Sequence, residues 1–356
     1  MIKKILITLF LFYSALAQQN QMDQNQFMLA ESYEQQGNLG KAVEIVEGLN
    51  KKDPTNIQFF NKLNTLYLQL KKYDESVLLI ESRIKIVPQD VNLYGMLGST
   101  YYTAGDRNKA YKIWEDAIEQ FKSNQMTIRI ISNYAIEKRD FEKAIEYLNL
   151  GKALSKDPYL FSYDLAELYQ ITMRYREAAN EYCNLIKANP AQYQQIESKI
   201  LSYSNKPGAI DETIEVVKKF KSYDLNFSYL LARLLIEKKN YEEAFIIYKE
   251  LDKKGNDKGS ELLSFANFIY RENAFEVALN VFQYILDNYK NEEIIPAAKL
   301  GYAKSKEAIF VAKYKSANPE WKTFFIPKAA DGKDVQPVIE AYKDITDIYK
   351  HSDVAI

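Results

Sequence analysis

The sequence has few of the residues on which most catalytic and metal sites depend. Its 356 residues include one histidine, His351, and one cysteine, Cys183. A single cysteine excludes an intramolecular disulfide, and a single histidine excludes the histidine-rich ligand sets of most zinc sites. No phosphate-binding glycine motif, H-E-x-x-H motif or G-x-S-x-G motif occurs. We therefore predict that the protein is not an enzyme and that it holds no metal and no cofactor.

Glycine and proline are also scarce. The chain has 12 glycines and 9 prolines, about 6% of its residues against about 12% in an average protein. A β-sandwich needs many turn residues, so this shortage argues against one and favours helices. Apolar residues make up 47% of the chain, which is enough for a sizeable core and argues against disorder.

The chain has neither an excess of positive charge nor a long apolar run after its first residues. Its formal net charge is −1 at pH 7, whereas a nucleic-acid-binding protein normally carries a basic face. No later stretch approaches 18 consecutive apolar residues, the length expected of a membrane-spanning helix. We therefore expect no nucleic-acid partner and no insertion of the mature chain into a membrane.

The first segment has the pattern of a secretory signal peptide. Two lysines precede an apolar run over residues 5–13, and a small-residue A-x-A site ends at Ala17, directly before Gln18. The run is too short to span a bilayer, and no cysteine follows the site to carry a lipid. We predict a signal peptide over residues 1–17, cleaved between Ala17 and Gln18, and an exported protein that is periplasmic or secreted.

Small residues recur along the chain with a period of 34. They are Ala42, Ser76, Ala110, Ala144 and Ala178, followed after an interruption by Ala244 and Ala278. The clearest unit reads Tyr94-x2-Leu97-Gly98-x2-Tyr101 and then Ala110-x3-Trp114. Each half of this pattern places its apolar residues on one face of a helix. Because a two-helix unit cannot bury both faces alone, the period predicts a stack of helical hairpins.

This pattern resembles the tetratricopeptide signature, W-x2-L-G-x2-Y followed by A-x3-F and P. The resemblance implies an all-α fold, a right-handed α-solenoid of stacked helix-turn-helix repeats. We place eight repeats in residues 18–292 and a ninth, with an aromatic insertion over 316–334, in 293–356. The eight are 23–56, 57–90, 91–124, 125–158, 159–192, 193–224, 225–258 and 259–292. The end of the chain resembles the start of a further repeat, so we expect a truncated reading frame or a helix that a partner supplies.

The resemblance also implies where a partner would bind. In tetratricopeptide proteins the first helix of each repeat lines a concave groove that binds peptides or helices. Mapped onto that geometry, the inner face carries Tyr102, Arg129, Asn133, Tyr163, Glu167, Tyr229, Arg233, Asn267, Tyr270 and Arg271. Arg129-x3-Asn133 resembles the opening of the family's carboxylate clamp. Asp164 lies where the clamp has its next asparagine, so an acceptor stands where a donor is needed.

A second candidate contact lies in the inserted loop, which carries Trp321, Phe324 and Phe325 within five residues. These aromatic side chains either pack on the solenoid or present an anchor to a partner.

The leading interpretation is a non-enzymatic scaffold of the bacterial envelope that binds proteins or peptides on its concave face. One alternative is the N-terminal repeat portion of a larger envelope enzyme or cell-wall-binding protein. Another is a subunit of an outer-membrane assembly or secretion machine. The sequence specifies neither the partner nor the oligomeric state.

Overall fold

The computed structural model describes residues 21–255, 258–290, 293–317 and 330–348. Within these ranges the chain is built from helices and turns and contains no β-strand. The all-α, helical-repeat fold expected from the 34-residue period is therefore confirmed. The proposed cleavage site at Ala17 and Gln18, the loop residues Trp321, Phe324 and Phe325, and His351 lie outside the described residues.

The chain divides into two compact units, Met1–Leu168 and Tyr169–Ile356, which we call the N-terminal and C-terminal units. The division falls within α9 (Ser162–Ile171). Before α9, a helix described from residue 21 to residue 35 is followed by α2 (Leu39–Lys52), α3 (Ile57–Gln69), α4 (Tyr73–Ile86), α5 (Val91–Ala104), α6 (Arg107–Gln120), α7 (Gln125–Glu137) and α8 (Phe141–Leu154).

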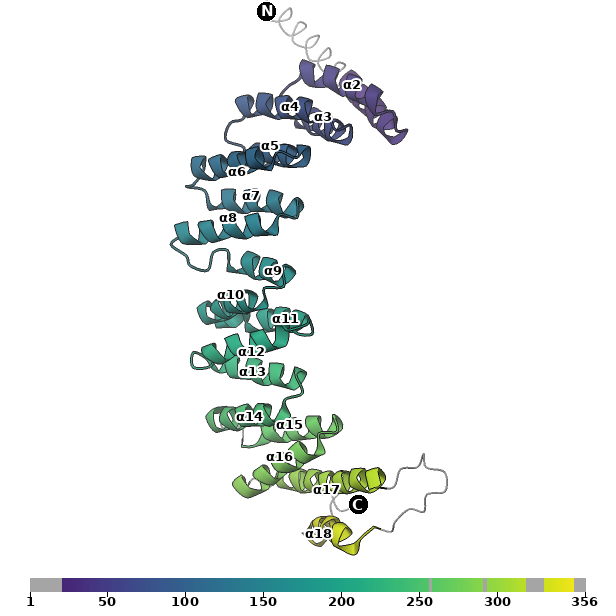
Figure 1. Cartoon of the computed structure of the whole chain (residues 1–356), viewed down its shortest axis with the longest axis vertical. Coiled ribbons are helices and arrows are strands. Elements are labelled where there is room, and N and C mark those ends of the chain that lie inside the picture. Colours follow the sequence, from purple (N-terminus) through teal and green to yellow (C-terminus); the bar gives the residue numbers. More distant parts are fainter. Residues whose placement is uncertain (1–20, 256–257, 291–292, 318–329, 349–356) are drawn as a thin grey trace, which may run out of the picture. The chain divides into compact units, whose positions relative to one another are not determined.

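The C-terminal unit continues the same alternation of helices. Its elements are α10 (Tyr175–Ala188), a short 3-10 helix (Pro190–Gln192), α11 (Tyr193–Ser204), α12 (Ala209–Phe220), α13 (Leu225–Glu237), α14 (Tyr241–Gly255), α15 (Ser260–Arg271), α16 (Phe275–Asn288), α17 (Ile295–Ala317) and α18 (Gly332–Ile348). Within each unit consecutive helices pack as hairpins, for example α5 on α6 and α13 on α14 (Figure 1).

The residues that recur every 34 positions lie where the two helices of a hairpin meet. Each is completely shielded from solvent: Ala42, Ser76, Ala110, Ala144, Ala178, Ala244 and Ala278, and also Thr213, which replaces alanine in the irregular sixth unit. The opposite helix has a matching small residue at Gly98, where an added Cβ would overlap the indole of Trp114. Small side chains at these positions let the helices approach closely.

The turns between paired helices share a backbone conformation that has the same period. One residue with positive φ stands two positions before the second helix at Gly37, Lys71, Gly105, Arg139, Met173, Lys239 and Asn273, with φ between 58° and 96°. The left-handed region is unfavourable for residues with a side chain. Glycine avoids this cost at only two of these seven turns.

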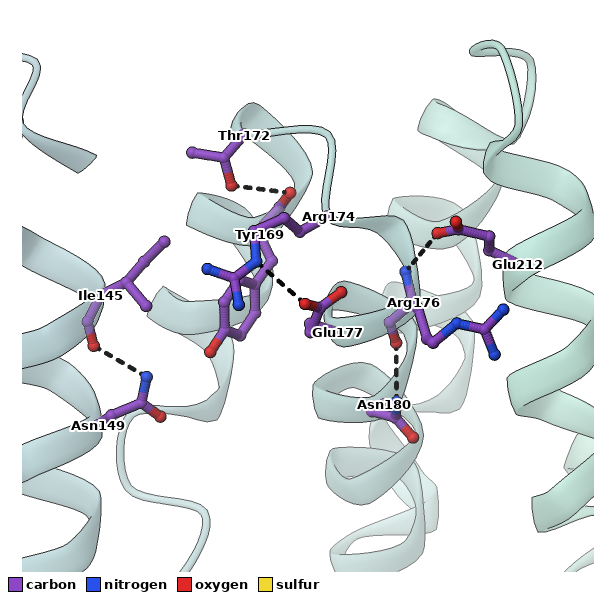
Figure 2. Close-up of polar contacts among 9 residues, drawn as sticks. All are labelled: Ile145, Asn149, Tyr169, Thr172, Arg174, Arg176, Glu177, Asn180 and Glu212. Carbon is purple, nitrogen blue, oxygen red and sulfur yellow. Dashed lines mark hydrogen bonds and ion pairs between the residues drawn. The ribbon is translucent and has the colours of Figure 1, made fainter. Parts of the chain in front are cut away.

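Four second helices begin with a side chain that caps one of their free N–H groups. Asn38, Asp106, Asp140 and Asn240 each accept a hydrogen bond from the backbone N–H three residues later. At α10 the cap position is Arg174, whose side chain does not cap the helix. Instead the Glu212 carboxylate of α12 accepts from the Arg176 N–H at 3.0 Å, so the next repeat caps this helix (Figure 2).

The last helices differ slightly from the sequence expectation of a loop over 316–334. α17 continues to Ala317, and α18 begins at Gly332, three residues earlier than the sequence suggests. The Asp331 carboxylate accepts from the Lys333 N–H at 3.0 Å and so satisfies a donor at this helix start.

We predict that Gly98→Ala lowers the free energy of unfolding by about 1–3 kcal/mol, because the new methyl group displaces the fully buried Trp114 indole. Gly48→Ala is the matched control, since an added Cβ there meets no atom within 4 Å and alanine favours a helix. Urea unfolding of both variants measures the difference. Equal stability of the two variants would show that the helices do not depend on this close approach.

Candidate functional site

In the N-terminal unit, the two residues that resemble the opening of a carboxylate clamp are Arg129 and Asn133. The Arg129 guanidinium, on α7, forms an ion pair with the Asp164 carboxylate of α9 at 2.8 Å. It also lies 5.5 Å from the centre of the Phe161 ring. The acidic residue that departs from the clamp pattern therefore pairs with the cation that would have bound a ligand carboxylate. Asn133 is exposed one turn further along α7.

The other predicted residues of this unit are partly packed. The Tyr102 ring stacks on Trp114 with 6.1 Å between ring centres, and the Arg107 guanidinium lies 5.1 Å from it. Burial, followed by the negative charge of Asp140, raises the pKa of Tyr102. Tyr163 and Glu167 are half-buried on α9. These positions lie on the first helices of their repeats.

In the C-terminal unit a pocket of about 640 Å³ opens between α13 and α15. These two helices make fewer close contacts with each other than α11 makes with α13 or α15 with α17, and α3 and α5 are similar in this respect. The lining residues come from α13, α14 and α15, and they are Tyr229, Arg233, Ile236, Glu237, Tyr248, Ser260, Glu261, Ser264, Phe265 and Phe268. Two of the predicted residues, Tyr229 and Arg233, therefore face one cavity.

The pocket has an aromatic wall. The rings of Tyr248 and Phe265 are stacked with 4.5 Å between their centres and an interplanar angle of 20°. Burial raises the pKa of Tyr248, and the charge of Glu261 raises it further while Arg233 opposes the shift. The Tyr248 hydroxyl therefore stays neutral at physiological pH, and it lies within the fields of both charged residues.

Polar groups are placed along the rim of the pocket. The Tyr229 hydroxyl donates to Glu261 Oε1 at 3.1 Å, which joins α13 to α15. Arg233 is exposed on the next turn of α13, and Glu237 is exposed one turn beyond it. The Ser264 hydroxyl donates to the Ser260 carbonyl.

The remaining predicted residues lie on α15 outside the pocket lining. Asn267 and Arg271 are exposed, and Arg271 Nε donates to the Asn267 carbonyl at 3.3 Å. The Tyr270 ring packs against Phe275 with 5.4 Å between ring centres. These three residues therefore do not share the cavity that Tyr229 and Arg233 line.

The described part of the chain contains no group of three or more histidine, cysteine, aspartate or glutamate side chains that could hold a metal. Cys183 is fully buried, and burial raises the pKa of its thiol. A buried thiol that stays protonated is a core residue rather than a nucleophile.

Curated proteins of similar sequence include one that is described by its repeats. A protein of Methanocaldococcus jannaschii described as TPR repeat-containing is 25% identical over 164 residues, which is 46% of this chain and 29% of the relative. The chain carries repeats of the tetratricopeptide type. No family model matches it, and the matched segments span 23–38% of the length of its curated relatives. A tetratricopeptide fold supports a role as a protein-interaction scaffold in general.

Solved tetratricopeptide structures are similar at low sequence identity. One from Parabacteroides merdae is 15% identical, with 67% of this chain and 95% of that chain covered and a TM-score of 0.32. The C-terminal part of a TPR repeat-containing protein from Cytophaga hutchinsonii is 18% identical, with 76% and 98% covered and a TM-score of 0.32.

Sequence reasoning missed most of the pocket. Tyr248 lies on the second helix of its tetratricopeptide repeat, and the family groove is assigned to first helices. Glu261, Phe265 and Phe268 lie on a first helix at spacings of four and seven residues, which place them on one helix face. That spacing was visible in the sequence, but it does not distinguish a pocket wall from an ordinary core face.

We predict a weak coupling between Arg129 and Asp164, because both side chains are about one-third exposed and water screens the pair. A double-mutant cycle with Arg129→Gln and Asp164→Asn should give about 0.2–1 kcal/mol in urea unfolding. A coupling of several kcal/mol would contradict this view and would make the pair a principal tie between α7 and α9.

Proposed function

We propose that the protein is a non-enzymatic scaffold that binds a protein or peptide partner in the pocket between α13 and α15. One observation carries the proposal: a cavity of about 640 Å³ combines an arginine with four aromatic side chains contributed by α13, α14 and α15. Cavities of this size accommodate a ligand or a few side chains. Tyrosine and arginine are enriched among the residues that dominate binding energy at interfaces.

The composition of the pocket supports binding rather than catalysis. Its described lining contains no histidine, cysteine or lysine. Of its two carboxylates, Glu237 is exposed and Glu261 accepts a hydrogen bond from the Tyr229 hydroxyl. The Ser264 hydroxyl donates to a carbonyl of its own helix, which is a common local bond rather than activation by a base.

We further propose that the scaffold is exported to the bacterial envelope, where it acts in the periplasm or outside the cell. The support is the signal-peptide pattern of residues 1–17. In the part of the chain that the structure describes, no helix is both long enough and apolar enough to cross a membrane.

Expression of the full chain in a bacterium that exports proteins should yield a mature form that begins at Gln18. Small residues at Ala15 and Ala17 fit the cleavage site, so Ala17→Arg should block processing. N-terminal sequencing and mass spectrometry of the fractionated cells measure both results. An intact Met1 on cytoplasmic protein would contradict export.

Filling the pocket should abolish partner capture without unfolding the chain. Ser264→Trp places a large side chain at an exposed position of the lining, and we expect at least a tenfold loss of recovered partner from an envelope extract. The matched control is Ser198→Trp on α11, because Ser198 is also exposed and also donates to the carbonyl four residues earlier. Equal capture by the two variants at equal melting temperature would contradict a role for this pocket.

A further inference from the structure

The charged residues of the pocket alternate in sign along its length. Tyr229, Arg233 and Glu237 follow one another at four-residue spacing on α13 and so lie on one helix face. At the Tyr229 end, the Glu261 carboxylate accepts a hydrogen bond from the tyrosine hydroxyl. The pocket therefore has one cation between two carboxylates.

Arg233, the cation between these two carboxylates, has no ionic partner in the described part of the chain. No hydrogen bond or ion pair involves Arg233 there, although two carboxylates line the same pocket. Arg129 of the N-terminal unit differs, because Asp164 neutralises it at 2.8 Å. A guanidinium that is exposed and unpaired can form a bidentate bond with a carboxylate from outside.

An apolar surface lies beside that cation. The charge of Arg233 acts on Tyr248, whose ring stacks on Phe265, and Phe268 and Ile236 complete the apolar lining. A partner side chain that reaches this wall buries apolar area next to the guanidinium. Both contacts fit within a segment of a few residues.

From this arrangement we propose that the pocket binds an internal segment of a partner protein in which one acidic residue adjoins one aromatic residue, with no further acid on either side. The acid pairs with Arg233 and the aromatic ring packs on the Tyr248–Phe265 wall. Glu237 and Glu261 repel additional negative charge, so an acidic tail that ends in a free carboxylate binds less tightly. This inference rests on the proposed function and specifies the ligand of the same site.

A random nonapeptide library displayed on phage, selected on the full chain, tests the chemistry without knowledge of the natural partner. The enriched peptides should share one aspartate or glutamate next to a tryptophan, tyrosine or phenylalanine. In fluorescence anisotropy, replacing the acid of the best peptide by its amide should raise the Kd about 10- to 100-fold, the usual loss for a hydrogen-bonded charge pair. A second acid beside the first should also raise the Kd.

Protein variants show whether Arg233 is the recognising group. Arg233→Gln should weaken the best peptide about as much as amidation of its acid does, and Arg271→Gln, an exposed arginine outside the pocket lining, should leave the Kd unchanged. If the selected peptides lose affinity for Ser264→Trp but not for Arg233→Gln, this inference is overturned and the proposed function stands. A library that yields no peptide sensitive to Ser264→Trp would contradict both.

Discussion

The structure depends on the close approach of two helices at one fully buried small residue per repeat. Alanine, serine or threonine occupies this position in every unit where the period can be followed, and none of these side chains is exposed to solvent. The facing helix contributes Gly98 at the best-defined contact, against the Trp114 indole. Because interiors are packed to the density of organic crystals, little room exists for a larger side chain there. The hairpin then leaves an apolar face that the next hairpin covers.

The same packing leaves the faces of first helices available for binding. Neighbouring first helices such as α15 and α17 are in direct contact. α13 and α15 make fewer close contacts, and the pocket beside the stacked rings of Tyr248 and Phe265 opens between them. The pocket is therefore lined by the helices of the repeats themselves rather than by an added loop or domain. The polar groups along its rim can fix the orientation of a ligand in a cavity that is otherwise largely apolar.

The fold was predictable from the sequence because its determinant repeats: a buried small residue every 34 positions is visible without coordinates. The left-handed turns were not predictable, because five of the seven positions carry lysine, arginine, methionine or asparagine rather than glycine. The pocket was predictable only at Tyr229 and Arg233, since Tyr248 comes from a second helix. For Arg129 the sequence pattern resembled a binding motif, but in the structure its guanidinium forms an ion pair with Asp164. The sequence does not show this pairing, because it depends on how α7 and α9 are placed.

Site-specific photocrosslinking tests most directly whether the space between α13 and α15 holds a protein partner, as we propose. A photoreactive phenylalanine analogue would replace Phe268, which lines the pocket, or Ile246 on α14, which is 51% exposed and lies outside the lining. In cells that express the full chain, we expect a discrete protein adduct from position 268 and none from position 246. Identical adducts from both positions, or none from position 268 in a folded protein, would contradict this proposal.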